Sequence, residues 1–253
     1  MTDINKSLLN DLLKDLGKEY KKVGGKFTKA ELIIVGGASI VLNYDFRGST
    51  TDVDAFCYAA SSLKDAASKV ADKYGLPRDW LNSDFTNTAS YSNKLSQYSR
   101  YYKTFSNCLE IRTINAEYLV AMKIASGRDY KNDLSDIIGI RDSHLECGNP
   151  LTFEKVQTAV MNLYGDWNYI SEENREFLKN TFSDYSTVVY TDIQNMERAN
   201  KENLIEFDRK YPNALTNDNV HEVTKKLEER IIEMQRKMAT QTSERNKQKD
   251  HSR

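Results

Sequence analysis

Two aspartates stand two positions apart in the segment DVDAFCYA, residues 52–59. The segment is predicted to be a strand, on which Asp52 and Asp54 point to one face and Val53 to the other. The Cα atoms of the two aspartates would lie roughly 6.5 to 7 Å apart. Carboxylates at this spacing can hold a pair of Mg²⁺ ions about 3.5 to 4 Å apart. Because magnesium completes its coordination with phosphate oxygens and water, the pair predicts a metal site that acts on a phosphate-bearing substrate.

Two glycines precede these acids and end the apolar run ELIIVGG, residues 31–37. This run predicts a buried strand, followed by a helix over residues 38–44. Gly36 and Gly37 have no Cβ, so backbone N–H groups, the helix N-terminus and the Ser39 hydroxyl could hold a triphosphate. Tight packing alone also explains a strand–Gly–Gly–helix turn, and neighbouring acids usually lie on solvated faces. Together, in this order and spacing, the two features are far more specific.

The stretch GGAS, followed by RGSTTDVD, resembles the first motif of the DNA-polymerase-β-like nucleotidyltransferases. The form Arg-x-x-Thr-x-Asp-x-Asp, which starts at Arg47 and includes Thr50, is similar to the bacterial abortive-infection branch, often toxins of type IV toxin–antitoxin systems. The resemblance covers roughly residues 30–182 and includes DWLN (79–82) and EYLVAMKIASGRDYKNDLSDI (117–137). It implies a Mg²⁺ cofactor, an NTP substrate, and nucleotide contacts from Arg47 and Thr50.

A single charged residue, Lys123, interrupts the apolar run YLVAMKIA, residues 118–125. A lysine on a buried helix is costly unless its amine is paired or faces a cleft. A lysine at the edge of the core, with its amine in water, explains the pattern as well. The resemblance favours a functional role, because it implies that Lys123 contacts the triphosphate and offsets charge on the leaving pyrophosphate.

An acidic block follows this helix. Arg128 could meet a phosphate, and Asp133 and Asp136 share one helical face because they are three positions apart. The resemblance implies that one of these acids completes the site or fixes the lysine. Asn132 departs from the family pattern, so the assignment stays open, with Asp136 favoured and Asp133 second. The alternative is a solvated helix face paired with Arg128 or Lys131.

The segment CLEIRTI, residues 108–114, predicts a third strand on which Glu110 and Arg112 share a face. Polymerase-like transferases often use a third carboxylate on such a strand as a metal ligand or general base. Glu110 is therefore a further candidate metal ligand. A surface pair between Glu110 and Arg112 explains the residues equally well.

Residues 83–107 are rich in Ser, Tyr and Asn and predict an irregular segment with at most one strand. Tyrosines and basic residues alternate within it, a pattern that can stack bases and meet phosphates. A loop folded onto the core explains it better. Trp80, in DWLN, is predicted to be a core residue.

The elements that must position these residues follow from periodicity. Helices are predicted at residues 5–22, 62–75, 116–127, 129–144, 152–165, 171–182 and 221–238, with Thr152 and Ser171 as N-caps of the fifth and sixth. We therefore expect an α/β (α+β) fold: a small mixed-sheet nucleotidyltransferase core, followed by a helical C-terminal region. The predicted domains are residues 1–145, a helical domain over 146–185, and a charged helical extension over 186–253 with a frayed tail.

Composition sets further bounds. The 253 residues include 36 basic and 37 acidic ones, so no global positive field predicts nucleic-acid binding. Three cysteines lie far apart and predict reduced thiols in a cytoplasmic protein, with Cys57 and Cys108 in the core. No apolar run reaches the ~18 residues of a membrane span, and the N-terminal residues lack the apolar region of a signal peptide.

The leading prediction is a Mg²⁺-dependent enzyme that moves a nucleoside monophosphate from an NTP to an acceptor hydroxyl. The resemblance suggests a tRNA 3′ end or another RNA as acceptor, and implies a cognate antitoxin. One alternative is a small-molecule acceptor, as in the aminoglycoside nucleotidyltransferases. Another is a catalytically idle interaction module that uses the charged C-terminal helices. The sequence has no signal for the preferred base or the oligomeric state.

Overall fold

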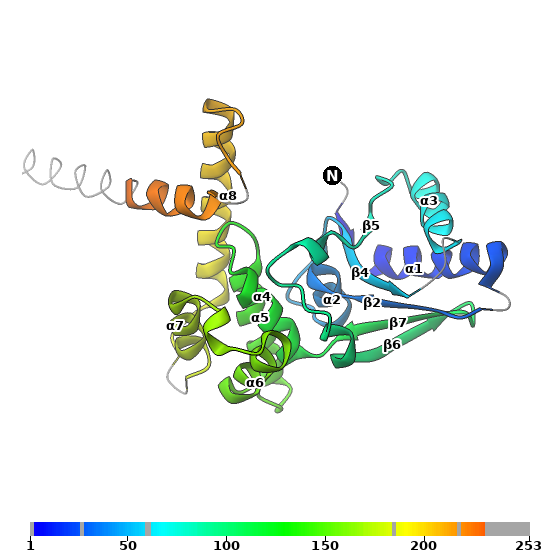
Figure 1. Ribbon diagram of the computed structural model, residues 1–253, viewed down its shortest axis with the longest axis horizontal. Coiled ribbons are helices and arrows are strands. Elements are labelled where there is room, and N and C mark those ends of the chain that lie inside the picture. Colours follow the sequence, from blue (N-terminus) through cyan, green and yellow to red (C-terminus); the bar gives the residue numbers. More distant parts are fainter. Residues whose placement is uncertain (1–2, 26–27, 59–61, 184–185, 217–218, 231–253) are drawn as a thin grey trace, which may run out of the picture. The chain divides into compact units, whose positions relative to one another are not determined.

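A computed structural model of the chain describes residues 3–25, 28–58, 62–183, 186–216 and 219–230 (Figure 1). It has the predicted mixed α/β fold, with a five-stranded sheet in the order β5–β4–β2–β7–β6. Its strands are β2 (Ala30–Ile34), β4 (Val53–Tyr58), β5 (Leu81–Asn82), β6 (Ser99–Phe105) and β7 (Leu109–Ile114). Two short strands, β1 (Ile4–Asn5) and β3 (Ser49–Thr50), pair antiparallel beside it.

The strand directions bring the glycines and the aspartates to one edge of the sheet. β2 pairs antiparallel with β4 and parallel with β7. The end of β2 therefore lies beside the start of β4: Ile34 faces Ala55, and the amide of Val35 donates to the carbonyl oxygen of Asp54 at 2.9 Å. The turn that follows β2 and the acids at the start of β4 are thus neighbours, although 15 or more positions separate them in the sequence.

Helices α1 (Lys6–Tyr20) and α3 (Ser62–Tyr74) pack against each other and close the core on one face of this sheet (Figure 1). The Asn5 side chain caps α1 by accepting the amide hydrogen of Leu8 at 2.9 Å. Apolar residues of α1 join the inward-facing strand residues in one buried cluster; among them are Leu9, Leu12, Leu13, Leu16, Leu32, Ile34, Val53 and Ala55. Each such leucine contributes roughly 1.5 to 3 kcal/mol by burial, so this face fixes which strand residues point the other way.

Apart from the last, which lies where only a charged helical extension was predicted, the remaining helices agree with the predicted ones to within a few residues. They are α2 (Gly36–Asn43), α4 (Ala116–Ser126), α5 (Asp133–Glu146), α6 (Phe153–Tyr164), α7 (Glu172–Thr181) and α8 (Tyr190–Lys210). Short helical turns occur at Lys21–Gly25, Asp84–Asn87, Leu95–Tyr98 and Trp167–Tyr169. Both predicted N-caps are confirmed, because the side chains of Thr152 and Ser171 accept backbone amides.

Residues 220–230 are helical, while the later part of the predicted helix 221–238 and the predicted frayed tail lie outside the described residues. The chain divides into two compact units. One comprises Met1–Gly127 and Ser135–Tyr190, and the other Arg128–Leu134 and Thr191–Arg253. The domain boundaries predicted near residues 145 and 185 stay predictions. No helix in the described ranges is both long and apolar enough to cross a bilayer.

Two predictions about single core residues had opposite outcomes. Trp80 is 2 % exposed, and its indole N–H donates to the carbonyl of Ala67 at 3.0 Å, so the core prediction is confirmed. Cys108 is buried as predicted, but Cys57 is exposed, so that prediction is wrong. Cys57 lies near the end of β4, beyond the part of the strand in which Val53 and Ala55 are buried.

Candidate active site

The glycine turn opens helix α2 directly after β2, with Val35 at the N-cap position. Gly36 has a φ of +57°, a left-handed conformation that residues with a Cβ rarely adopt. A Cβ at this position would lie 3.5 Å from Oδ2 of Asp54. The first amides of a helix lack partners within it, so this turn places N–H donors next to a carboxylate, as a site for a phosphate and a cation requires.

Gly37 leaves space for two side chains from the segment that leads to the aspartates. A Cβ at Gly37 would lie 2.8 Å from Nη2 of Arg47 and 2.9 Å from Oγ1 of Thr50. Arg47 donates from Nε to the carbonyl of Ser49 at 3.1 Å, and the Thr50 hydroxyl donates to the carbonyl of Asp52 at 3.2 Å. Arg47 and Thr50 therefore stabilise the backbone of the segment that leads to the aspartates. Direct contact of these two residues with the nucleotide stays a prediction.

The two aspartates occupy different environments. β4 begins at Val53, so the prediction that Asp52 lies within the strand is wrong by one residue, and Asp52 is exposed in the preceding bend. Val53 and Ala55 are buried in the core, and Asp54 between them is half-buried on the opposite face. The alternation predicted for Asp54 is thus present, and the bend leaves Asp52 open to solvent at the same edge.

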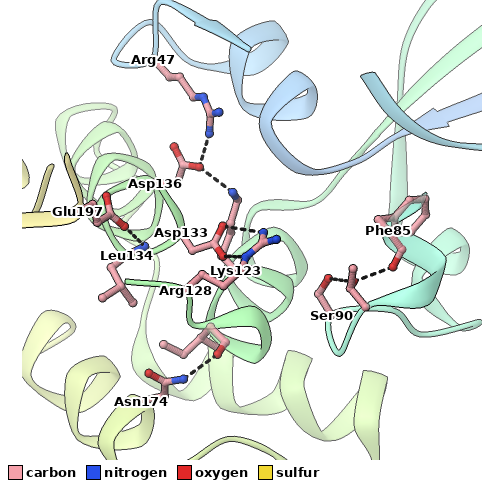
Figure 2. A network of polar contacts seen from close by, with 12 residues as sticks. Arg47, Phe85, Ser90, Lys123, Arg128, Asp133, Leu134, Asp136, Asn174 and Glu197 are labelled. Atoms are coloured by element: carbon pink, nitrogen blue, oxygen red, sulfur yellow. Dashed lines mark hydrogen bonds and ion pairs between the residues drawn. The ribbon is translucent and has the colours of Figure 1, made fainter. Parts of the chain in front are cut away.

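A buried acid organises two cations in the same unit. Asp136 is 1 % exposed; its Oδ2 lies 2.8 Å from Nζ of Lys123 and also pairs with Nη1 of Arg47 (Figure 2). Lys123 is itself only 8 % exposed, so its amine is paired rather than directed into water. One carboxylate thus holds both cations in place. Oδ1 of Asp136 has no hydrogen-bond partner within the described ranges.

Comparison with known proteins identifies the family. Residues 11–189, more than half of the chain, match the model of the family described as "Nucleotidyltransferase of unknown function (DUF6036)". The chain belongs to this nucleotidyltransferase family. No curated protein and no solved structure matches it.

Two of the predicted site residues, Ser39 and Glu110, are not brought to this edge of the sheet. Ser39 is fully buried, and its hydroxyl has no partner in the described part of the chain, so the structure does not place it at the surface of the glycine turn. Its place on α2 explains this, because Ala38 and Ile40 beside it are buried as well. Gly36 and Gly37 in the same turn are half-buried.

Glu110 lies too far along the sheet to share a metal ion with Asp54. It pairs across β2 with Glu31, which in turn faces Tyr58, four residues beyond Asp54 on β4. Four residues of strand span about 13 Å. Oε1 of Glu110 lies 3.0 Å from Nη1 of Arg112, so the structure has the surface pair that the sequence offered as the alternative.

Arg128 and Asp133 belong to the second compact unit. Arg128 binds Asp133 through two nitrogens, at 2.7 Å from Nε and 3.3 Å from Nη2. Asp133 is 1 % exposed, and the amide of Leu134 beside it donates to Glu197 at 2.8 Å (Figure 2). The sequence left open which of the two acids fixes the lysine. In the structure Asp136 pairs with Lys123, and Asp133 pairs with Arg128. A nucleotide contact from Arg128 stays a prediction.

The donor set fits magnesium that is completed by its substrate. Within the described ranges, no group of three or more His, Cys, Asp or Glu residues could hold a metal ion by itself. Magnesium typically takes one or two carboxylates together with substrate phosphates and water, rather than a full protein cage. Asp52 and Asp54 are two carboxylates beside the glycine turn.

Two neighbours of Asp54 were not predicted as site residues. Asn82 on β5 is the register partner of Asp54, and its side-chain oxygen accepts the amide of Asp84 at 2.8 Å. Phe56 follows Asp54 by two positions and shares its face of β4. The period of two in DVDAF could have indicated Phe56, but the pairing of β5 with β4 has no local signal in the sequence.

Proposed function

We propose that this nucleotidyltransferase moves a nucleoside monophosphate from an NTP to an acceptor hydroxyl, with Mg²⁺, and that the acceptor is the 3′ end of an RNA such as tRNA. The observation that supports the site is the approach of Oδ2 of Asp54 to within 3.5 Å of a Cβ position at Gly36. In the proposal, the turn would bind the phosphates and the neighbouring carboxylate would hold the metal, at one edge of the sheet.

In this proposal the turn at Gly36 and Gly37 binds the β- and γ-phosphates through backbone N–H groups. Asp52 and Asp54 would hold Mg²⁺, which when bound neutralises the phosphate oxygens and orients them. Lys123 adds a positive charge for the triphosphate. Because this lysine is buried and fixed by its partner acid, its charge acts in a medium that screens it less than water does.

The acceptor oxygen forms a bond to the α-phosphorus while the bond from that phosphorus to the β-bridging oxygen breaks. Pyrophosphate leaves with the electron pair of that bond, and the proton of the hydroxyl passes to water. Most of the rate comes from holding the two reactants in line and from the fixed positive charges. Asp136 acts as a positioning residue in this scheme, because it touches Lys123 and Arg47.

The test is a transfer assay with each of the four α-labelled NTPs, on bulk cellular RNA or on a set of aminoglycosides, with and without Mg²⁺. We expect label on RNA, in the presence of Mg²⁺ only. Label on an aminoglycoside alone would favour the small-molecule alternative. The toxin-like role with a cognate antitoxin adds one expectation, namely that expression of the active chain slows growth.

Asp54→Asn should reduce transfer by roughly 10²- to 10³-fold, because it weakens the metal site and leaves the fold unchanged. Asp65→Asn, an exposed acid on α3, is the matched control and should keep full activity. Equal growth inhibition by the wild type and Asp54→Asn would instead support the catalytically idle interaction module.

A further inference from the structure

Three aromatic rings form a cluster next to Asp54 that the proposed reaction does not use. Phe56 packs edge-on against Phe85, with ring centroids 4.8 Å apart. Tyr91 completes the cluster at 6.0 Å from Phe56 and 6.1 Å from Phe85. Phe85 is buried, whereas Phe56 and Tyr91 are half-buried.

The cluster lies on the side of Asp54 away from the glycine turn. β4 runs antiparallel to β2, so each residue after Asp54 lies farther from the turn at the end of β2. Phe56 is two residues on, about 7 Å along the strand, and on the same face as Asp54. The glycine turn, the carboxylate of Asp54 and the ring of Phe56 therefore lie one after another along the direction of β4.

The segment that supplies Phe85 and Tyr91 is held in place. The hydroxyl of Thr88 donates to the carbonyl of Phe85 at 2.7 Å and lies 2.7 Å from Oγ of Ser90 (Figure 2). The Tyr164 hydroxyl donates to the carbonyl of Ser90 at 2.9 Å. Burial raises the pKa of Tyr164, so this hydroxyl stays a neutral donor. The rings are thus preorganised, a property that lowers the cost of binding a partner.

We infer that the ring cluster of Phe56, Phe85 and Tyr91 is the acceptor subsite, and that it takes an acceptor with a planar base next to the attacking hydroxyl, such as the terminal nucleoside of an RNA. The inference rests on the proposed function. If the turn holds the leaving pyrophosphate on one side of Asp54, in-line displacement requires the attacking oxygen to come from the other side. On that side lies Phe56, and an aromatic ring stacks on the flat face of any base.

The test uses a short RNA with 2-aminopurine as its 3′-terminal base, whose fluorescence falls when the base stacks. With the full chain, Mg²⁺ and a non-hydrolysable NTP, we expect quenching by the wild type and by Phe56→Tyr, which keeps the ring. Phe56→Leu and Tyr91→Leu should lose the quenching and raise the KM for the RNA acceptor by about tenfold or more. The affinity for a fluorescent NTP analogue should stay within about twofold, and thermal unfolding of each variant reports its fold.

Failure of this inference differs from failure of the proposed function. If the wild type transfers to RNA but Phe56→Leu, still folded, keeps the quenching and the acceptor KM, the inference alone is wrong. It is also wrong if the variant weakens binding of the NTP analogue rather than of the RNA, since the rings would then bind the base of the substrate. Absence of transfer by the wild type to any acceptor would contradict the proposed function itself, whatever the variants do.

Discussion

Two acids in the first compact unit have similar burial and similar partners but different surroundings. Asp15 on α1 is 7 % exposed, and Asp136 on α5 is 1 % exposed. Asp15 binds Nζ of Lys18 at 2.8 Å, and its other oxygen pairs with Lys73 and accepts the Tyr74 hydroxyl at 2.9 Å. In this way Asp15 ties α1 to α3.

The difference lies in the cations and in the unused oxygen. The side chains that bind Asp15 are more than half exposed, at 53 % for Lys18 and 62 % for Lys73. Those that bind Asp136 are 10 % exposed for Lys123 and 15 % for Arg47, and Oδ1 of Asp136 has no partner within the described residues. Solvent screens the ion pairs of Asp15, because its lysines are exposed. Both carboxylate oxygens of Asp15 have hydrogen-bond partners. The network of Asp136 lies largely out of solvent, so its charges are screened less.

The largest effect on stability is expected from Asp136→Ala. This change leaves the charges of Lys123 and Arg47 buried without their common partner, and removal of one side of a buried ion pair costs about 3 to 5 kcal/mol. Denaturant unfolding should show a loss of that size. Asp15→Ala, the matched change in the other network, should cost far less, because Lys18 and Lys73 return to water.

Asp136→Asn sharpens the same comparison, because it keeps the shape and removes the charge. If Asp136 positions Lys123, the Asn variant should bind an NTP analogue more weakly and lose transfer activity while it remains folded. Equal destabilisation by Asp136→Ala and Asp15→Ala would contradict the argument that burial of the partners separates the two acids.

An intermediate effect is expected from Gly37→Ala. The new Cβ would lie 2.8 Å from Nη2 of Arg47, so the guanidinium that binds Asp136 must move, at a cost of about 1 to 3 kcal/mol. Gly48→Ala is the matched control, because nothing lies within 4 Å of a Cβ there, and it should change stability by less than about 0.5 kcal/mol. Thermal unfolding and binding of an NTP analogue should be measured for both variants. If Gly37→Ala has the stability and the binding affinity of the wild type, Arg47 is not tightly held.

Local patterns predicted much of the fold and part of the site. The run before Gly36, the alternation around Asp54 and the apolar helix around Lys123 each depend on neighbours in the sequence, and the structure has all three. The N-caps at Thr152 and Ser171 belong to the same class of short-range signal. Hydrogen bonds and burial within a few residues determine such features, so periodicity is enough to find them.

Contacts between distant segments could not be predicted. The pair of Arg47 and Asp136 joins residues 89 positions apart, and no periodicity indicates it. The alternation of side chains predicted which face of the sheet Glu110 lies on. It could not predict how far along the strands Glu110 lies from Asp54, because that depends on the register of β7 with β2. The sequence could not choose between Asp133 and Asp136 either. Asp133 pairs with Arg128 close by in the sequence, a pair that the sequence offered, whereas Asp136 binds Lys123 and Arg47 on other elements, contacts that spacing does not indicate.

The smallest effect, and the one with a distinct pH dependence, is expected from Asp15→Asn. Hydrogen bonds from Lys18, and then from Lys73, hold the pKa of Asp15 well below its ordinary value of 3.8, although burial opposes them. Because the folded pKa lies below the unfolded one, the ionised carboxylate stabilises the fold above about pH 4, and this contribution falls as the pH drops below 3.8. The variant should therefore be less stable than the wild type by about 1 kcal/mol at neutral pH. In denaturant unfolding at low salt, this difference should start to shrink below pH 3.8 and vanish only as the pH falls through the lowered folded pKa. A difference that stays constant with pH would show that packing of the side chain, and not its charge, ties α1 to α3, and the contrast between the two acids would then rest on Asp136 alone.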